Sequence, residues 1–159
     1  MRRSPEVVVQ RREVIGLHLG YPGFEATAAY ADPPGDEAPG AVARPALVGF
    51  GYGYQGRPGQ WWHDTVARRL GPEQTRRWLD DGFELAELHV LPAYQAHGTG
   101  RLLLRDVMTR ADAAHITLST PDLDTPARRL YRSEGFVDLL TDFYFPGSNE
   151  AYAVMGVDR

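Results

Sequence analysis

The stretch LHVLPAYQAHGTGRLLL, residues 88 to 104, joins a predicted strand to a predicted helix through a turn that contains two glycines. Pro92 ends the strand, and Gly98 and Gly100 stand where the helix is expected to begin. The first N–H groups of a helix lack partners and carry partial positive charge, so they bind an anion when the backbone can be approached closely. From the spacing alone, the two glycines are equally consistent with a phosphate site and with a tight turn.

Motifs that would indicate a different chemistry are missing from the sequence. No GK[ST] follows the glycines, as a Walker loop requires, and Leu103 stands where a dinucleotide-binding motif has its third small residue. The histidines form no HxxxH or HExxH pair, which argues against a metal site, and no GxSxG indicates a serine hydrolase.

Composition restricts the class of protein further. A chain of 159 residues with 43% hydrophobic and 24% charged residues is expected to form a single domain, residues 1–159, with a buried core. The net charge of -4 argues against nucleic-acid binding, and no apolar run is long enough for a membrane span. The absence of cysteine excludes disulfides and a cysteine nucleophile. We expect a cytoplasmic protein.

Hydrophobic periodicity and breaker residues predict alternating helices and strands. Ser4 and Pro5 begin the first helix, and Thr125 and Pro126 begin the last one. The predicted helices cover 5–18, 60–70, 72–81, 98–114 and 125–134. The predicted strands cover 24–31, 46–54, 83–91, 116–120, 136–145 and 150–157.

The order of these elements indicates the fold class. From residue 83 the order is strand, helix, strand, helix, strand, strand, so the first three elements require a parallel pair with a right-handed crossover. The expected fold is α/β or α+β with a mixed sheet, and residues 58–82 form a helical insert between two strands. In the helix over 98–114, one stripe is predicted to hold Leu103, Val107, Arg110 and Ala114.

The stretch from residue 88 resembles the signature of the GNAT superfamily, the acyl-CoA-dependent N-acetyltransferases. That signature is an apolar strand, V-x-P and then [QR]-x-x-G-x-[GA], and its matches here are Val90, Pro92, Gln95, Gly98 and Gly100. Downstream, TPARRLYRSEGF resembles the family pattern A-x-x-[LF]-Y-x-x-x-G-F, with matches at Ala127, Leu130, Tyr131, Gly135 and Phe136. Two motifs in the family's order make a strong joint signal over about residues 83–145.

The resemblance implies a GNAT-like sheet, mixed and mostly antiparallel, flanked by helices. A full domain of this family usually begins with a strand and a helix before the helix predicted over 5–18, so the chain is expected to be shortened at its amino terminus. The alternative is that VVVQ from Val7 forms that first strand. The implied cosubstrate is acetyl-CoA, with its pyrophosphate on the backbone amides of the loop over 95–101.

Residue by residue, the resemblance assigns a set of positions to coenzyme binding. These are Leu88, His89, Val90, Gln95, Ala96, His97, Gly98, Thr99, Gly100, Arg101, Asp124, Ala127 and Tyr131. Asp124 stands where many members of the family carry asparagine. The backbone N–H of Val90 or of a neighbour is the implied oxyanion donor.

Acetylation of an amine requires removal of the ammonium proton and protonation of the departing thiolate. Glu87 and His89 share one face of their strand by the two-residue period, and Leu88 and Val90 share the other. If Leu88 and Val90 pack into the core, the two polar residues point into the cleft. Glu87 is then the first candidate for the general base and His89 the second, while Tyr131 occupies the position of the family's thiolate-protonating tyrosine.

The acceptor is not identified by the sequence. Trp61 and Trp62, with Asp64 nearby, would suit a cationic amine, but at least one tryptophan of the pair is expected in the core. Aromatic residues over 143–145 are further candidates for the acceptor cleft.

The leading hypothesis is direct transfer of an acetyl group from acetyl-CoA to a primary amine of a small molecule or a peptide. The alternative is an acyl-CoA-binding sensor or regulatory module that would keep the loop over 95–101 without needing Glu87 or Tyr131. A homodimer remains open, because an incomplete sheet would leave an edge strand for a partner chain.

Overall fold

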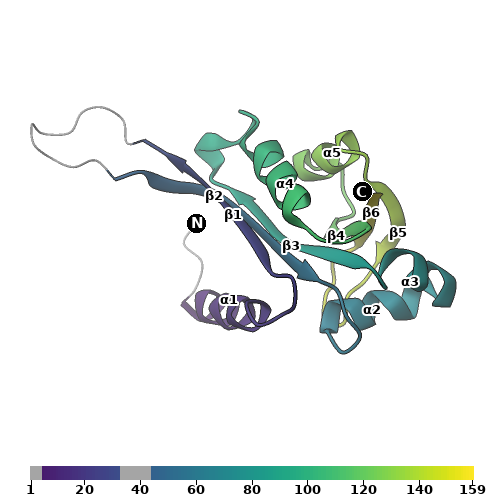
Figure 1. Cartoon of the computed structure of the whole chain (residues 1–159). Helices are drawn as coiled ribbons and strands as arrows, with labels where there is room; N and C mark the ends of the chain where they lie inside the picture. Colours follow the sequence, from purple (N-terminus) through teal and green to yellow (C-terminus); the bar gives the residue numbers. More distant parts are fainter. Residues whose placement is uncertain (1–4, 33–43) are drawn as a thin grey trace, which may run out of the picture.

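The computed structural model describes residues 5–32 and 44–159 and contains one six-stranded sheet with helices on both faces (Figure 1). The helices are α1 (Pro5–His18), α2 (Trp61–Leu70), α3 (Pro72–Trp78), α4 (Thr99–Arg110) and α5 (Pro126–Ser133), with a short 3₁₀ turn, η1 (Pro92–Tyr94). The strands are β1 (Glu25–Ala31), β2 (Ala46–Gln55), β3 (Gly82–Val90), β4 (His115–Pro121), β5 (Val137–Phe143) and β6 (Tyr152–Asp158).

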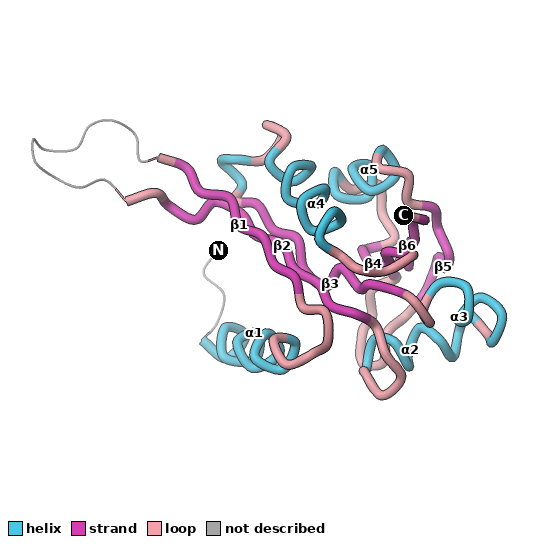
Figure 2. Tube along the Cα trace, viewed as in Figure 1, coloured by secondary structure: helices cyan, strands magenta, loops and turns pink. Residues whose placement is uncertain are grey.

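The sheet has the strand order β1-β2-β3-β4-β6-β5. Every neighbouring pair is antiparallel except β3 and β4, which are parallel. The helix α4 lies between these two strands along the chain, and the tube in Figure 2 traces the connection. The predicted mixed, mostly antiparallel sheet with one strand–helix–strand crossover is therefore confirmed. In the described part of the chain, β1 and β5 are the two edge strands.

The parallel pair β3–β4 separates part-way along its length. Its register covers only Gly82–Glu84 against His115–Thr117, whereas β3 continues to Val90 and β4 to Pro121. The two central strands therefore diverge towards their carboxyl ends and leave a gap in the middle of the sheet. No sequence pattern indicates this splay.

A β-bulge changes which side chains of β3 share a face. Tyr52 of β2 pairs with Glu87, but the next residue, Gly53, pairs with Leu85, so Ala86 is the extra residue. Glu84 pairs with Tyr54 and thus lies on the same face as Glu87 although the two are three residues apart. Simple alternation would put these two carboxyl groups on opposite faces.

Two clusters of buried side chains lie on the two faces of the sheet. One packs beneath α4 and α5 and includes Leu104, Val107, Ile116, Leu118 and Tyr131. The other packs beneath α2 and α3 and includes Trp62, Val66, Trp78, Phe143 and Phe145. In Figure 1, α4 and α5 lie on one side of the sheet, and α1, α2 and α3 lie on the other. The predicted helical insert thus covers part of one face of the sheet.

The prediction for the carboxyl end of α4 is wrong. The helix ends at Arg110 rather than at Ala114, because Ala111 is extended (φ -58, ψ 125) and the chain must turn to enter β4. Asp81 accepts a hydrogen bond from Ala114 N at 3.3 Å in that turn. The buried stripe accordingly contains Leu103, Leu104, Val107 and Ala111, while Arg110 is exposed and pairs with Asp106 at 3.0 Å.

The amino-terminal helix has the predicted bounds, Pro5–His18, so VVVQ lies in a helix and does not form a strand. Its predicted N-cap, Ser4, lies outside the described residues, as does most of the turn-rich loop over 32–40. Thr125 is confirmed as the N-cap of α5, because its side chain accepts a hydrogen bond from Arg128 N at 3.1 Å. Within residues 5–32 and 44–159, no helix has the length and apolar character needed to cross a membrane.

Candidate active site

The start of α4 is an open helix terminus. Gly98 is its N-cap in the left-handed region (φ 84), and no side chain caps the helix. The first-turn N–H groups therefore point out of the helix start without a partner in the preceding turn. Nothing lies within 4 Å of the position that a Cβ of Gly98 would take. This geometry combines the two properties required of an anion site, unpaired N–H groups and close access.

The loop before α4 is attached to the end of β3. Gln95 Nε2 donates to the carbonyl of Val90 at 2.9 Å, and Ala96 adopts a positive φ of 62°. Leu91 N donates to Val48 of β2 at 2.8 Å. Because successive backbone N–H groups of a strand point to opposite sides, Val90 N–H points away from β2, towards the gap between β3 and β4.

A cavity of about 490 Å³ lies between the end of β3, this loop and the start of α5. We call it the donor cavity. It is lined by Leu88, Val90, Gln95, Ala96, Gly98, Gly100, Arg101, Thr125, Pro126, Ala127, Leu130 and Tyr131. Nine of these twelve residues belong to the sequence-predicted coenzyme set. The volume is in the range of small-ligand sites, and the cavity has a helix start on its wall.

Several predicted residues lie outside the lining of the donor cavity. His97 is exposed in the loop, and Thr99 is only partly buried at the first position of α4. The Asp124 side chain is 75% exposed and pairs with Arg129 at 2.9 Å, so it points to solvent. His89 lies on the opposite face of β3 from Leu88 and Val90.

Sequence reasoning missed three residues of the lining, Thr125, Pro126 and Leu130. All three belong to the stretch TPARRLYRSEGF that had been recognised as a motif. The available signal was the helix start itself, since Thr125 and Pro126 place the first turn of α5 beside the cavity.

Arg101 brings positive charge to the cavity but already has a partner. It forms an ion pair with Glu134, and Arg105 binds the same carboxylate at 2.7 Å. These two arginines hold the pKa of Glu134 below its usual range, Arg105 most of all. One carboxylate against two guanidinium groups leaves a net positive charge at this end of α4.

Tyr131 is one of the residues that line the donor cavity. Its side chain is buried and packs on Phe136, with ring centroids 5.7 Å apart. Burial, and secondarily the negative charge of Glu87, raise the pKa of Tyr131 to about 12. The phenol therefore keeps its proton at neutral pH and is able to donate it.

Glu87 and His89 lie on the other face of β3, as the alternation predicts. Leu88, between them, packs against the core beneath α4 and α5. His89 Nε2 hydrogen-bonds the Glu87 carboxylate, and the His89 ring packs against Phe50 at 5.3 Å. The Glu87 side chain is 26% exposed and that of His89 is 42% exposed. A carboxylate in contact with an exposed imidazole is able to pass a proton to solvent.

A partly buried polar chain lies on the same face of β3 as this pair, and sequence analysis missed it. Glu84 hydrogen-bonds Tyr54, whose hydroxyl is 3.5 Å from His18 Nε2, and His18 Nδ1 is 3.2 Å from the Tyr52 hydroxyl. Burial raises the pKa of Glu84 to about 8 and lowers the pKa of His18. The bulge at Ala86 puts Glu84 in this chain, and no sequence pattern marks that bulge.

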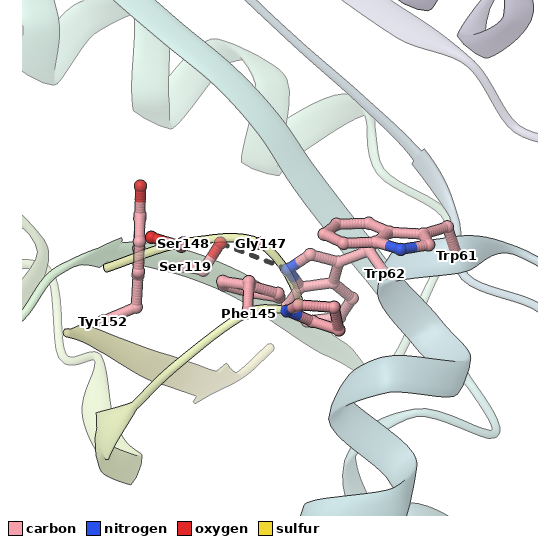
Figure 3. Close-up of a pocket in the computed structure, with 8 residues that line it drawn as sticks. Trp61, Trp62, Ser119, Phe145, Gly147, Ser148 and Tyr152 are labelled. Carbon is pink, nitrogen blue, oxygen red and sulfur yellow. Dashed lines mark hydrogen bonds between the residues drawn. The ribbon is translucent and has the colours of Figure 1, made fainter. Parts of the chain in front are cut away.

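The tryptophans of the insert have different environments. Trp62 and Trp78 belong to the core beneath α2 and α3, which confirms the expectation that at least one of the neighbouring pair is buried, whereas Trp61 is 60% exposed. Trp61, Trp62 and Phe145 line a second cavity of about 350 Å³ (Figure 3). Asp64 does not line it, because its carboxylate accepts hydrogen bonds from Gly59 N at 3.1 Å and pairs with His63.

Comparisons with known proteins agree with the site geometry. The acetyltransferase (GNAT) domain family matches residues 60–138. The GCN5-like protein acetyltransferase Rv2170 of Mycobacterium tuberculosis is 33% identical over 159 aligned positions, which cover 87% of this chain and 76% of that protein. The chain belongs to the GNAT acetyltransferases.

Solved structures show the same GNAT fold at lower identity. Arabidopsis thaliana NAA60, in complex with a bisubstrate analogue, has a TM-score of 0.64 and 17% identity, with 92% of this chain and 83% of that chain covered. The acetyltransferase yncA from Salmonella typhimurium, solved with its cofactor acetyl-CoA, has a TM-score of 0.56 and 16% identity, with 99% of this chain and 75% of that chain covered. At these identities the two structures show the fold that they share with this chain.

Proposed function

We propose that the chain is an N-acetyltransferase that moves the acetyl group of acetyl-CoA directly onto a primary amine of a small molecule or a peptide. One observation carries this proposal: the donor cavity with Tyr131 and the acid–base pair with Glu87 lie on opposite faces of the sheet, on the two sides of the gap between β3 and β4. Burial, and secondarily the negative charge of Glu87, raise the pKa of Tyr131.

The donor side suits a thioester with an anionic tail. The N–H groups at the start of α4 and the net charge of Arg101 and Arg105 favour a pyrophosphate. Val90 and Tyr131 line the same cavity as this helix start. The Val90 N–H that points into the gap is suited to stabilise the oxyanion on the thioester carbonyl. Asp124 is not assigned to coenzyme binding in this proposal, because its carboxylate is exposed.

The acid–base side suits removal of a proton from the amine. Glu87 takes a proton from the acceptor ammonium and passes it through His89 to solvent. The neutral nitrogen then attacks the thioester carbon and forms the C–N bond. The nitrogen loses its second proton by the same route through Glu87 and His89 to solvent, and the C–S bond then breaks. Tyr131 donates its proton to the departing thiolate and regains one from solvent.

The test is titration calorimetry with acetyl-CoA and with desulfo-CoA, run beside a thiol-release assay over a panel of primary amines. Binding together with thiol release, and a product heavier by one acetyl group in mass spectrometry, is the expected result. Binding without release on any amine would favour the sensor instead. Failure to bind acetyl-CoA would show that the loop over 95–101 is only a turn. A cytoplasmic location and a single domain over 1–159 remain predictions.

A further inference from the structure

The second cavity, which we call the aromatic pocket, is separate from the donor cavity and has a different lining. It encloses about 350 Å³ and is lined by Trp61, Trp62, Ser119, Phe145, Pro146, Gly147, Ser148 and Tyr152. These residues come from the start of α2, from β4 and from the β5–β6 connection with the first residue of β6. In Figure 3, Trp61 and Tyr152 stand at opposite ends, with Phe145 and Trp62 between them.

The rings of the aromatic pocket are held in place by one another and by a hydrogen bond. Trp61 stacks on Phe145 with centroids 5.3 Å apart, and Phe145 meets Tyr152 edge-to-face at 5.2 Å. Trp62 Nε1 donates to Ser119 Oγ at 3.1 Å, as the dashed line in Figure 3 marks. The lining is uncharged at neutral pH. An aromatic, uncharged and preformed cavity suits a flat apolar group.

The position of Ser119 relates this pocket to the acid–base pair. Thr117 of β4 is the register partner of Glu84, and Ser119 follows it by two residues on the same face of β4. Glu87 follows Glu84 by three residues, one of which is the bulge residue Ala86. Ser119 and Glu87 therefore lie at a similar level on the two diverging strands. Both belong to the face that α1, α2 and α3 cover in Figure 1.

The aromatic pocket is poorly suited to hold the reacting amine itself. Aromatic faces stabilise a cation, whereas attack on a thioester requires the neutral amine. The pocket instead suits an uncharged part of the acceptor, with the amine directed towards Glu87. Asp64, the acid closest in sequence to Trp61, is tied to Gly59 N and His63 and offers the pocket no counter-ion for a second cationic group.

We propose that the aromatic pocket is the acceptor-specificity site and binds an uncharged aromatic group that the amine acceptor carries. This inference rests on the proposed function, because it names the acceptor class for that reaction. The aromatic group would come from a free arylalkylamine or from an aromatic residue at the amino terminus of a peptide. A polyamine carries no aromatic group, and the lining offers its second ammonium group no carboxylate.

The first experiment measures binding without turnover. The probe is 2-phenylethanol, which carries the ring but no amine, and binding is followed by saturation-transfer NMR in the presence of desulfo-CoA. We expect the signal in the unmodified chain and in Trp61→Phe, and its loss in Trp61→Ala. Tyr30→Ala is the matched control, since that ring is 64% exposed on β1, against 60% for Trp61. An equal signal in Trp61→Ala and in the control would overturn the proposal.

The second experiment compares acceptors in the thiol-release assay. We expect kcat/KM for 2-phenylethylamine to exceed that for propylamine by about tenfold or more, the gain expected from burying one aromatic side chain. Trp61→Ala should remove the preference by raising KM for 2-phenylethylamine, and Trp61→Phe should restore most of it. The same comparison of kcat/KM between Phe-Gly-Gly and Gly-Gly-Gly tests whether the aromatic group comes from a peptide. A higher kcat/KM for either aromatic acceptor supports binding of its ring in the aromatic pocket.

Two results separate failure of this inference from failure of the proposed function. Equal kcat/KM for propylamine and both aromatic acceptors, or a preference for putrescine, would overturn the aromatic specificity while leaving acetyl transfer intact. No thiol release with any amine, together with Trp61-dependent binding of 2-phenylethanol, would overturn the transferase and leave the pocket as an aromatic-ligand site.

Discussion

The donor cavity and the aromatic pocket lie on opposite faces of the same sheet and are built from different parts of the polypeptide. The donor cavity is formed by two continuous stretches, 88–101 and 125–131, and the groups that we propose bind the anion are backbone N–H groups at a helix start. The aromatic pocket is formed by side chains from α2, from β4 and from the β5–β6 region. Its ring contacts join residues that are far apart in sequence, such as Trp61 and Phe145.

This difference affects how each site responds to change. A backbone site depends on local conformation, so it requires glycine at one position and tolerates many neighbouring side chains. A side-chain pocket depends on the shape and chemistry of particular residues, so its specificity is altered by a single substitution. We therefore expect donor binding to vary little among relatives of this chain and acceptor choice to vary much. Four predictions test this division of roles, in order of expected effect on turnover.

Glu87→Gln should have the largest effect. Loss of the base should lower kcat by about 10²- to 10³-fold at neutral pH. The affinity for acetyl-CoA should stay within about twofold, because Glu87 lies on the face of β3 opposite the donor cavity. Steady-state kinetics and calorimetry check the two parts. Glu73→Gln, an exposed carboxylate on α3, is the matched control. A comparable loss of acetyl-CoA affinity in Glu87→Gln would break the assignment of the two faces.

Tyr131→Phe should lower kcat by about 10- to 100-fold, because the thiolate would then leave without a proton donor. The phenol with its pKa near 12 remains protonated, so the defect should be constant between pH 6 and pH 9. Thiol release measured across that range gives the profile. Tyr144→Phe, which removes the hydroxyl of an exposed tyrosine, should match the unmodified chain. A defect that disappeared at low pH would assign the proton donation to another group.

Gly98→Ala should weaken acetyl-CoA binding by about tenfold, with acceptor KM unchanged. The substitution strains a left-handed position and puts a methyl group in front of the helix start. Gly71→Ala is a close control, because Gly71 has a similar φ of 80°, precedes α3 and likewise has nothing within 4 Å of its Cβ position. Equal loss of affinity in both variants would show that only strain, and no phosphate contact, acts at Gly98.

Glu84→Gln should have the smallest effect on turnover and should change how the free energy of unfolding depends on pH. The carboxyl group keeps its proton up to about pH 8 when folded but loses it near pH 4.5 when unfolded, so folding takes up a proton between these values. The free energy of unfolding of the unmodified chain should therefore fall by up to about 1.4 kcal/mol per pH unit across that window.

The measurement is urea denaturation at several pH values between 4.5 and 8. In Glu84→Gln the neutral amide preserves a hydrogen-bonding partner for Tyr54 and does not titrate, so the slope should be flatter than in the unmodified chain. If the free energy of unfolding has the same pH dependence in the two proteins, Glu84 is already ionised in the folded chain. That result would contradict the raised pKa of Glu84.

Much of the fold and of the donor cavity could be predicted because the signals are local. Pro92, Gly98 and Gly100 mark the end of β3 and the start of α4, and Thr125 with Pro126 marks the start of α5. The end of α4 is an exception, and its origin is not local. Ala111 to Ala114 have helical propensity, but the sheet requires a turn there, so tertiary context ends α4 early.

The sequence alone determined the order of the elements, the single parallel pair, the GNAT resemblance and the face shared by Glu87 and His89. Each of these follows from periodicity, turn chemistry or a motif within about twenty residues. The tertiary structure decided where β3 separates from β4. It also decided the bulge at Ala86, which brings Glu84 to the same face of β3 as Glu87. The contacts of Phe145 with Trp61 and with Tyr152 are likewise tertiary. These features depend on strand pairing and on contacts across the sheet, which chain neighbours do not specify.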